Sequence, residues 1–134
     1  MPELPEVETV RRGLEDRLAG FRVDHLEVCR ERAIASNGGV EEFISKMKGR
    51  YVGAWLRRGK YLIATMHLEA ISNCKEQNTS SFCGWWGVHL RMTGQFQWHQ
   101  KKGLACPHTR VRFWDAKGSE LRFVDMRSFG QMWW

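Results

Sequence analysis

The sequence lacks any apolar run long enough to cross a membrane as a helix, and it lacks internal repeats and low-complexity segments. The pattern of a secretory signal peptide is also missing, because Glu3, Glu6 and Glu8 stand where such a peptide carries basic residues. These absences argue against the membrane-spanning and secreted classes. We therefore expect an intracellular protein with no membrane partner.

Cysteine is scarce, and its spacing matches no metal-binding pattern. Cys29, Cys74, Cys83 and Cys106 form no C-x-x-C pair and no cysteine–histidine cluster of zinc-finger spacing. We expect free thiols and no bound metal. A disulfide between Cys74 and Cys83 is the alternative, and a reducing cytosol disfavours it.

Charge of one sign is in excess. The 134 residues are 43% hydrophobic, which suffices for the core of one domain. Lysine and arginine number 21 against 15 acidic residues, so the net charge is +6. A basic surplus favours an anionic partner such as nucleic acid, although composition alone does not identify one.

Residues 5–18 carry the pattern of an amphipathic helix. Val7, Val10, Leu14 and Leu18 recur at spacings of three and four, which places them on one helical face. We therefore expect a helix with this face in the core.

Short strands follow, with one further helix. We expect strands near 23–28, 51–56, 61–68, 86–90 and 94–98, a hairpin at 110–123, and a helix at 40–47. The polar segment 69–84 is expected to be a surface loop. Many short strands with helices near the start predict a mostly β, α+β fold, a two-layer β-sandwich with flanking helices that occupies residues 1–134.

The first residues also carry chemistry. Removal of Met1 leaves Pro2 with a free secondary amine, whose pKa near 8 keeps a useful fraction unprotonated at neutral pH (roughly 7.7–8.0 for an α-amino group). Such an amine forms a Schiff base whose positive charge promotes β-elimination. Glu3, beside it, has the chemistry to move protons. The alternative is an ordinary helix start with no function.

Four blocks of the sequence resemble the bacterial formamidopyrimidine-DNA glycosylases, the Fpg family, and most closely its cyanobacterial members. They occur in the family's order and are Met1–Glu8, Arg57–Leu62, His89–Gly94 and Asp125–Gly130. The resemblance implies a DNA glycosylase/AP lyase of base-excision repair. Its partner would be double-stranded DNA that contains oxidised purines (8-oxoguanine, formamidopyrimidines) or abasic sites, and no protein partner is implied.

Carried over to this sequence, the resemblance implies four roles in catalysis. Pro2 matches the Schiff-base nucleophile and Glu3 the acid/base group. Lys60 matches the lysine of β-elimination and phosphate contact, and Glu6 matches a carboxylate that supports the pocket. A basic turn exposed to solvent is the alternative for Lys60.

The resemblance also implies how DNA is held. The damaged nucleotide must leave the helix, and Met92, Arg127 and Phe129 match the side chains that fill the space. His108 matches a further DNA-contact position. Without the resemblance, Met92 is equally well interpreted as a core residue, and Phe129 is better interpreted as a core strand residue. His89, in an apolar strand, is interpreted as a satisfied core histidine.

The second half of the family is not in this sequence. That half carries a helix–two-turn–helix motif, a zinc finger and the arginine of δ-elimination, so we expect no zinc and no other cofactor in this chain. The apolar end at Gln131–Trp134 suggests a fragment or a missing partner domain. Two alternatives remain, namely an inactive DNA-binding remnant and a member of the related endonuclease VIII group, which prefers oxidised pyrimidines.

Overall fold

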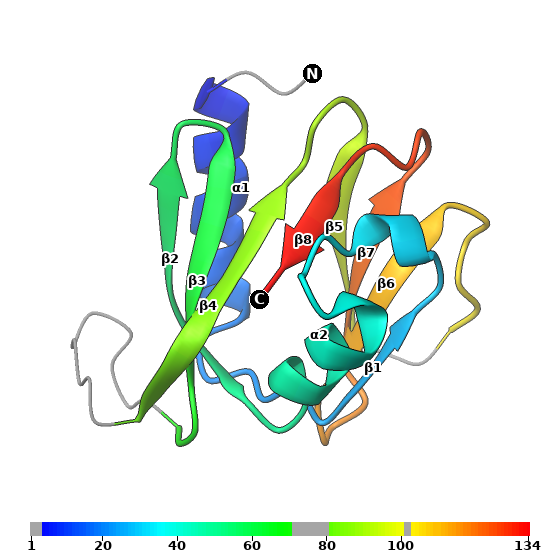
Figure 1. Ribbon diagram of the computed structural model, residues 1–134. Helices are drawn as coiled ribbons and strands as arrows, with labels where there is room; N and C mark the ends of the chain where they lie inside the picture. Colours follow the sequence, from blue (N-terminus) through cyan, green and yellow to red (C-terminus); the bar gives the residue numbers. More distant parts are fainter. Residues whose placement is uncertain (1–3, 71–80, 101–102) are drawn as a thin grey trace.

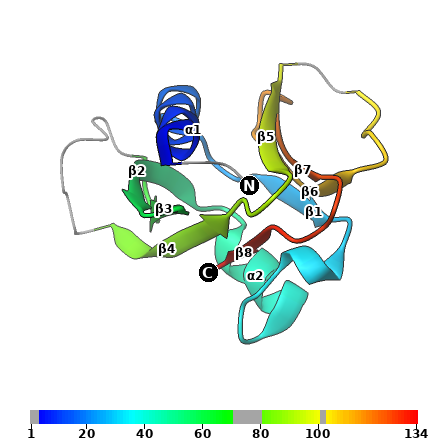
Figure 2. The ribbon, with the colours of Figure 1, turned by 90° about the horizontal axis from the view of Figure 1, so that it is seen from above.

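The chain folds into two antiparallel sheets that face each other, with a helix at each open edge of the sandwich (Figures 1 and 2). The computed structural model describes residues 4–70, 81–100 and 103–134. In chain order the elements are α1 (Leu4–Arg17), β1 (His25–Val28), the 3-10 turn η1 (Glu31–Ala33), α2 (Gly39–Met47), β2 (Tyr51–Arg58), β3 (Tyr61–His67), β4 (Phe82–His89), β5 (Gly94–His99), β6 (Thr109–Trp114), β7 (Glu120–Asp125) and β8 (Gln131–Trp133). The expected mostly β, two-layer sandwich with flanking helices is confirmed.

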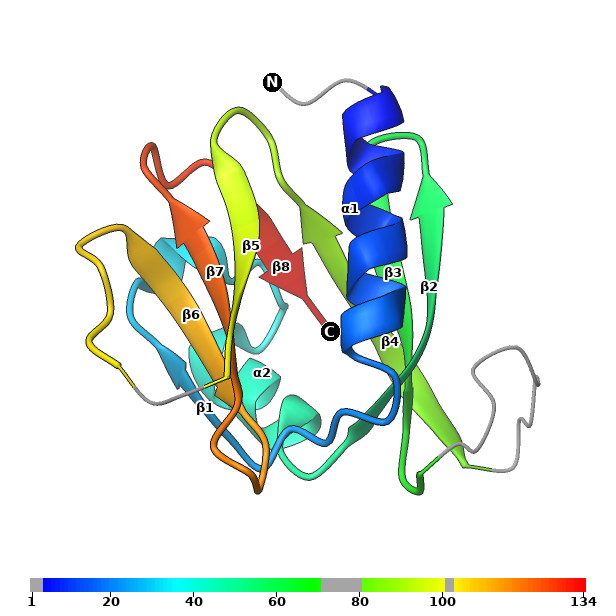
Figure 3. The ribbon, with the colours of Figure 1, turned by 180° about the vertical axis from the view of Figure 1, so that it is seen from behind.

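The strand order determines which loops meet. One sheet has the order β1-β6-β7-β5 and the other β2-β3-β4-β8, with antiparallel neighbours throughout. The β2–β3 hairpin and the β4–β5 and β7–β8 loops, which cross from one sheet to the other, all lie at one end of the sandwich (Figure 3). The first turn of α1 lies at the same end.

The core lies between the sheets, and Trp86 is near its centre. From β4, the Trp86 ring lies 5.1 Å from Trp55 in the same sheet and 5.0 Å from Phe113 in the facing sheet. Phe96 on β5 is 6.2 Å from Trp86 and 5.4 Å from Phe123. These edge and tilted contacts are the favoured arrangements of aromatic rings, and they join the two layers.

Most sequence-based elements are confirmed, and one is wrong. Helix 5–18 corresponds to α1, where Val7, Leu14 and Leu18 are buried as expected. The loop predicted at 69–84 is too long, because β4 begins at Phe82. Pairing with β3 across a bulge explains the difference, since backbone partners there override a polar local sequence.

Two further expectations concern membranes and thiols. Neither helix within the described ranges has the length and apolar composition of a membrane span. Cys83 carries a free thiol, as do Cys29 and Cys106, while Cys74 lies outside the described residues.

Candidate active site

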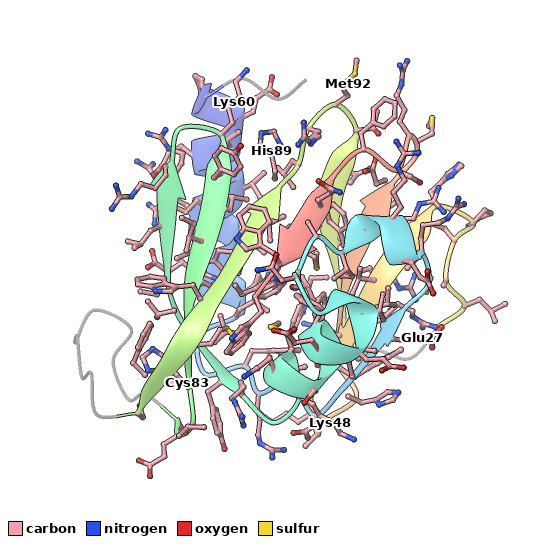
Figure 4. The ribbon with its side chains drawn as sticks, in the orientation of Figure 1. Glu27, Lys48, Lys60, Cys83, His89 and Met92 are labelled. Carbon is pink, nitrogen blue, oxygen red and sulfur yellow. The ribbon has the colours of Figure 1, made fainter. Side chains whose placement is uncertain are left out.

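The β2–β3 turn carries Lys60. Arg58 pairs with Tyr61, so Gly59 and Lys60 form a two-residue hairpin turn, and Gly59 has a φ of +60°. A positive φ at the first central position is typical of a type II′ turn and requires glycine there. Lys60 is half-buried at the tip, at the end of the molecule where α1 begins (Figure 4).

Glu8 connects this turn to α1. Its carboxylate accepts hydrogen bonds from Arg11 (Nη2, 2.8 Å) and Arg57 (Nε, 3.2 Å), and Arg57 also donates to the Gly59 carbonyl (3.1 Å). Hydrogen bonds from Arg11 hold the pKa of Glu8 at about 2 instead of 4.5, and bonds from Arg57 and Arg12 act in the same direction. The carboxylate therefore stays charged and fixes the turn against the first part of α1.

The β4–β5 loop presents Met92 to solvent. Arg91 has a φ of +54°, which non-glycine residues rarely adopt. Two backbone contacts hold the loop, since the Arg91 N–H donates to His89 Nδ1 (3.1 Å) and the Gly94 N–H donates to the Leu90 carbonyl (2.9 Å). Met92 is 46% exposed, so the interpretation as a core residue is wrong.

His89 is buried, yet it faces the candidate site. Burial lowers the pKa of its imidazole, and the positive charges of Arg91 and Lys60 lower it further. Because Nδ1 accepts a hydrogen bond from Arg91, the neutral ring carries its proton on Nε2. The Tyr61 ring packs edge-on at 4.6 Å. His89 is therefore a neutral, hydrogen-bonded histidine in the core, as the sequence predicts.

The β7–β8 loop carries Arg127 and Phe129. Ser128, between them, has a φ of +56°, a conformation that non-glycine residues rarely adopt. Arg127 is exposed and Phe129 is 40% exposed, so Phe129 is not a core strand residue. The guanidinium of Arg32, in η1, lies 5.4 Å from the centre of the Phe129 ring. This cation–π contact stabilises the position of the Phe129 ring beside η1.

The β4–β5 and β7–β8 loops, together with η1, line a concave pocket of about 400 Å³. It is lined by Arg32, His89, Arg91, Met92, Phe129 and Gln131. Its cations suit an anionic ligand, and the exposed methionine and phenylalanine suit contact with flat apolar groups. The side chains of Lys60, His89 and Met92 all lie at this end (Figure 4).

The remaining expected residues differ in how far the structure describes them. His108 is exposed and directly precedes β6. Glu6 lies in the first turn of α1 with an exposed side chain. Pro2 and Glu3 lie outside the described residues and directly precede Leu4, the first residue of α1. Among the described residues, no cluster of three or more His, Cys, Asp or Glu has the arrangement to hold a metal ion.

Comparison with known proteins identifies the family. The sequence model of the formamidopyrimidine-DNA glycosylase N-terminal domain matches residues 1–132. The chain belongs to the formamidopyrimidine-DNA glycosylase family. The formamidopyrimidine-DNA glycosylase of Prochlorococcus marinus (strain MIT 9313) is 63% identical over 134 residues, which is 100% of this chain and 46% of that relative. The chain thus spans about half the length of the curated relatives that it matches, and the resemblance seen in the sequence is confirmed.

Solved structures of the family give the same fold. Two complexes of the Lactococcus lactis Fpg, one with DNA containing N7-benzyl-Fapy-dG and one with abasic-site DNA, both superpose with a TM-score of 0.80. Their sequence identities are 30% and 29%, and each match covers 98% of this chain and 43% of the other.

Sequence reasoning gives no role in this site to Glu8 or Arg32. Each acts through a partner that is distant in sequence, namely Arg57, 49 residues after Glu8, and Phe129, whose ring contacts Arg32. The sequence carries no local signal for such pairs.

Proposed function

We propose that this chain is the catalytic half of a DNA glycosylase/AP lyase that removes oxidised purines from double-stranded DNA. One observation carries the proposal. The segments that present Lys60, Met92, Arg127 and Phe129 meet at the end of the sandwich where α1 begins. A lysine and residues suited to enter a base stack thereby share one face, and in the sequence Pro2 comes two residues before the first residue of α1.

In this proposal the amine of Pro2 attacks C1′ of the damaged nucleotide, the base departs, and the amine loses its proton. The C1′–O4′ bond then breaks as O4′ takes a proton, which gives a ring-opened iminium. The iminium draws electrons from the sugar, so a C2′ proton is lost and the 3′ phosphate leaves by β-elimination. Glu3 moves the protons of the attack, and Lys60 acts in the elimination and contacts phosphate. Glu6 supports the pocket. The chemistry needs no cofactor from this chain, because the amine itself is the nucleophile.

Access to C1′ requires that the nucleotide leave the duplex. Exposed Met92 and Phe129 have the shape and polarity to enter the vacated stack, and Arg127 has the donors to pair with the orphaned base. His108 adds a DNA contact beside them. We propose purines over pyrimidines because the His89–Met92 block and the Arg127/Phe129 pair resemble the purine-directed branch, and the endonuclease VIII group is the alternative.

An inactive DNA-binding remnant is the second candidate. The 134 residues span 46% of the length of the Prochlorococcus relative, so assayed by themselves they present fewer phosphate contacts, and each contact contributes to a salt-dependent affinity.

Covalent trapping separates the two. The protein is incubated with duplex DNA containing 8-oxoguanine opposite cytosine, or an oxidised pyrimidine, and borohydride is added to reduce any Schiff base. An enzyme gives a covalent complex with the 8-oxoguanine duplex that is lost in Pro2→Gly. If mass spectrometry verifies that Met1 has been removed and no covalent complex forms, the result supports the remnant. Stronger trapping on the pyrimidine lesion means the endonuclease VIII preference.

A further inference from the structure

Asp125, the last residue of β7, is a carboxylate without solvent exposure (0%) at the base of the candidate site. It stands opposite Gly94, the first residue of β5, so it lies where the β4–β5 and β7–β8 loops leave the sheets. A buried carboxylate is costly to desolvate and persists when hydrogen bonds satisfy both of its oxygens.

Both oxygens of Asp125 are satisfied by the two loops. Oδ1 accepts the hydroxyl hydrogen of Thr93, from the loop that carries Met92, and the backbone N–H of Arg127 (3.2 Å). Oδ2 accepts the backbone N–H of Gly130 at 2.6 Å. The Arg127 N–H also lies 3.0 Å from Thr93 Oγ1, so the three groups form one network.

The backbone of Asp125 extends this network to the segment before β6. Its N–H donates to the carbonyl of His108 at 3.0 Å, and its own carbonyl accepts from Arg110 Nε at 2.9 Å. Asp125 thereby contacts the segments that present Met92, His108, Arg127 and Phe129.

Close packing leaves little freedom at the far end of the β7–β8 loop. A Cβ on Gly130 would lie 2.9 Å from Asp125 Oδ2 and 2.7 Å from the Phe123 ring. Only glycine admits the approach of this backbone to the carboxylate. The segment from Arg127 to Gly130, which includes Phe129, is thus held at both ends by backbone hydrogen bonds to the Asp125 carboxylate.

We infer that Asp125 is a positioning residue that fixes the two DNA-entering loops relative to each other, so that Met92 and Phe129 are presented together before DNA arrives. The inference rests on the proposed function. The carboxylate touches no reacting atom. Its effect is to lower the cost of ordering two exposed loops when DNA binds.

The test uses Thr93→Val, which removes the hydroxyl that joins the β4–β5 loop to Asp125 and keeps the shape of the side chain. Thr93→Ser restores the hydroxyl. Thr65→Val is the matched control, because Thr65 Oγ1 accepts from the Ala54 N–H at 3.0 Å in the β2–β3 pair, outside this network. A second variant, Asp125→Asn, leaves only one acceptor oxygen and turns an NH₂ group toward Gly130.

Two measurements are made on each variant. The first is the ratio of borohydride trapping on duplex abasic-site DNA to trapping on single-stranded abasic-site DNA, where no base stack has to be entered. The second is hydrogen exchange at the amides of Arg127 and Gly130. We expect Thr93→Val to lower the ratio about tenfold, the effect of losing one hydrogen bond to a charged group. Thr93→Ser and Thr65→Val should leave the trapping ratio at the wild-type value.

We also expect faster hydrogen exchange at the Gly130 amide in Asp125→Asn and at the Arg127 amide in Thr93→Val. A Thr93→Val ratio equal to that of Thr65→Val, with unchanged exchange at Arg127, overturns the inference. Wild-type protein that traps on neither DNA refutes the proposed function instead. In that case the exchange data alone decide whether Asp125 fixes the loops.

Discussion

Glu120 is a fully buried charge, and Glu120→Gln is predicted to destabilise the fold strongly. Its side chain has no solvent exposure and accepts from Arg112 Nε and Arg122 Nε, each at 2.7 Å. Burial raises the pKa of Glu120, but hydrogen bonds from Arg112 and Arg122 outweigh burial, and the net shift is downward. The two arginine side chains are only 15% and 5% exposed, so the variant leaves their charges buried without the carboxylate.

The expected cost follows from this burial. Removing one partner of a buried ion pair costs about 3–5 kcal/mol. Glutamine keeps one acceptor oxygen for the arginines, so we expect about 3 kcal/mol, the lower end of that range. For a domain of this length such a loss lowers Tm by about 10 °C.

Thermal unfolding followed by circular dichroism at pH 7 measures the effect. Glu69→Gln removes the same charge from an exposed position and should change stability by less than about 0.5 kcal/mol. A folded-state pKa below the unfolded value means that the Glu120 contribution is present above pH 4.5 and is lost as the pH falls below it. The gap between wild type and Glu120→Gln should therefore narrow in acid. A variant as stable as Glu69→Gln, or a gap independent of pH, refutes this reasoning.

Four further predictions concern the site and the sheets. Glu8→Gln should lower Tm above pH 4.5, and its difference from wild type should vanish as the pH falls toward 2, because the Glu8 pKa is about 2 in the folded state. Gly87→Ala should destabilise the protein by about 2 kcal/mol in urea unfolding, since its Cβ would lie 2.2 Å from the Trp133 indole. An NMR titration of His89 should give a midpoint below the ordinary value of 6.5, and a midpoint above it would contradict the neutral ring. Phe129→Ala should reduce the fluorescence increase of 2-aminopurine placed beside an abasic site, while an equal increase would exclude Phe129 as the wedge.

The local sequence pattern predicts the helices and strands whose apolar residues recur with the period of the element. The spacing of Val7, Leu14 and Leu18 gives α1, because a helix repeat of 3.6 places them together. Alternation of Val111 and Phe113 with arginines gives β6 in the same way. In both cases the spacing of the apolar residues defines the element, although Arg110, on the other face of β6, is buried as well.

Elsewhere the local pattern fails because the deciding partner is distant. Small residues at Cys83 and Gly84 suggest a loop, yet Phe82 and Gly84 pair with β3 on either side of a bulge, and the Trp134 indole covers Gly84. Phe129 has the apolar side chain of a typical core residue. Its loop, however, leaves the sheet after Asp125 and holds the ring at the surface.

The sequence by itself determined the chemical groups, their order along the chain and the family. Pro2, Lys60 and the blocks around Met92 and Arg127 can be named from covalent structure alone, because reactivity and local periodicity are properties of neighbouring residues. The tertiary structure decided which groups meet. Antiparallel pairing brings three loops to one end of the sandwich, and Glu8 and Asp125 fix them there through contacts up to 49 residues apart. Such contacts form only when both sheets pack, since the entropy lost in ordering distant segments is offset by burial of the shared core.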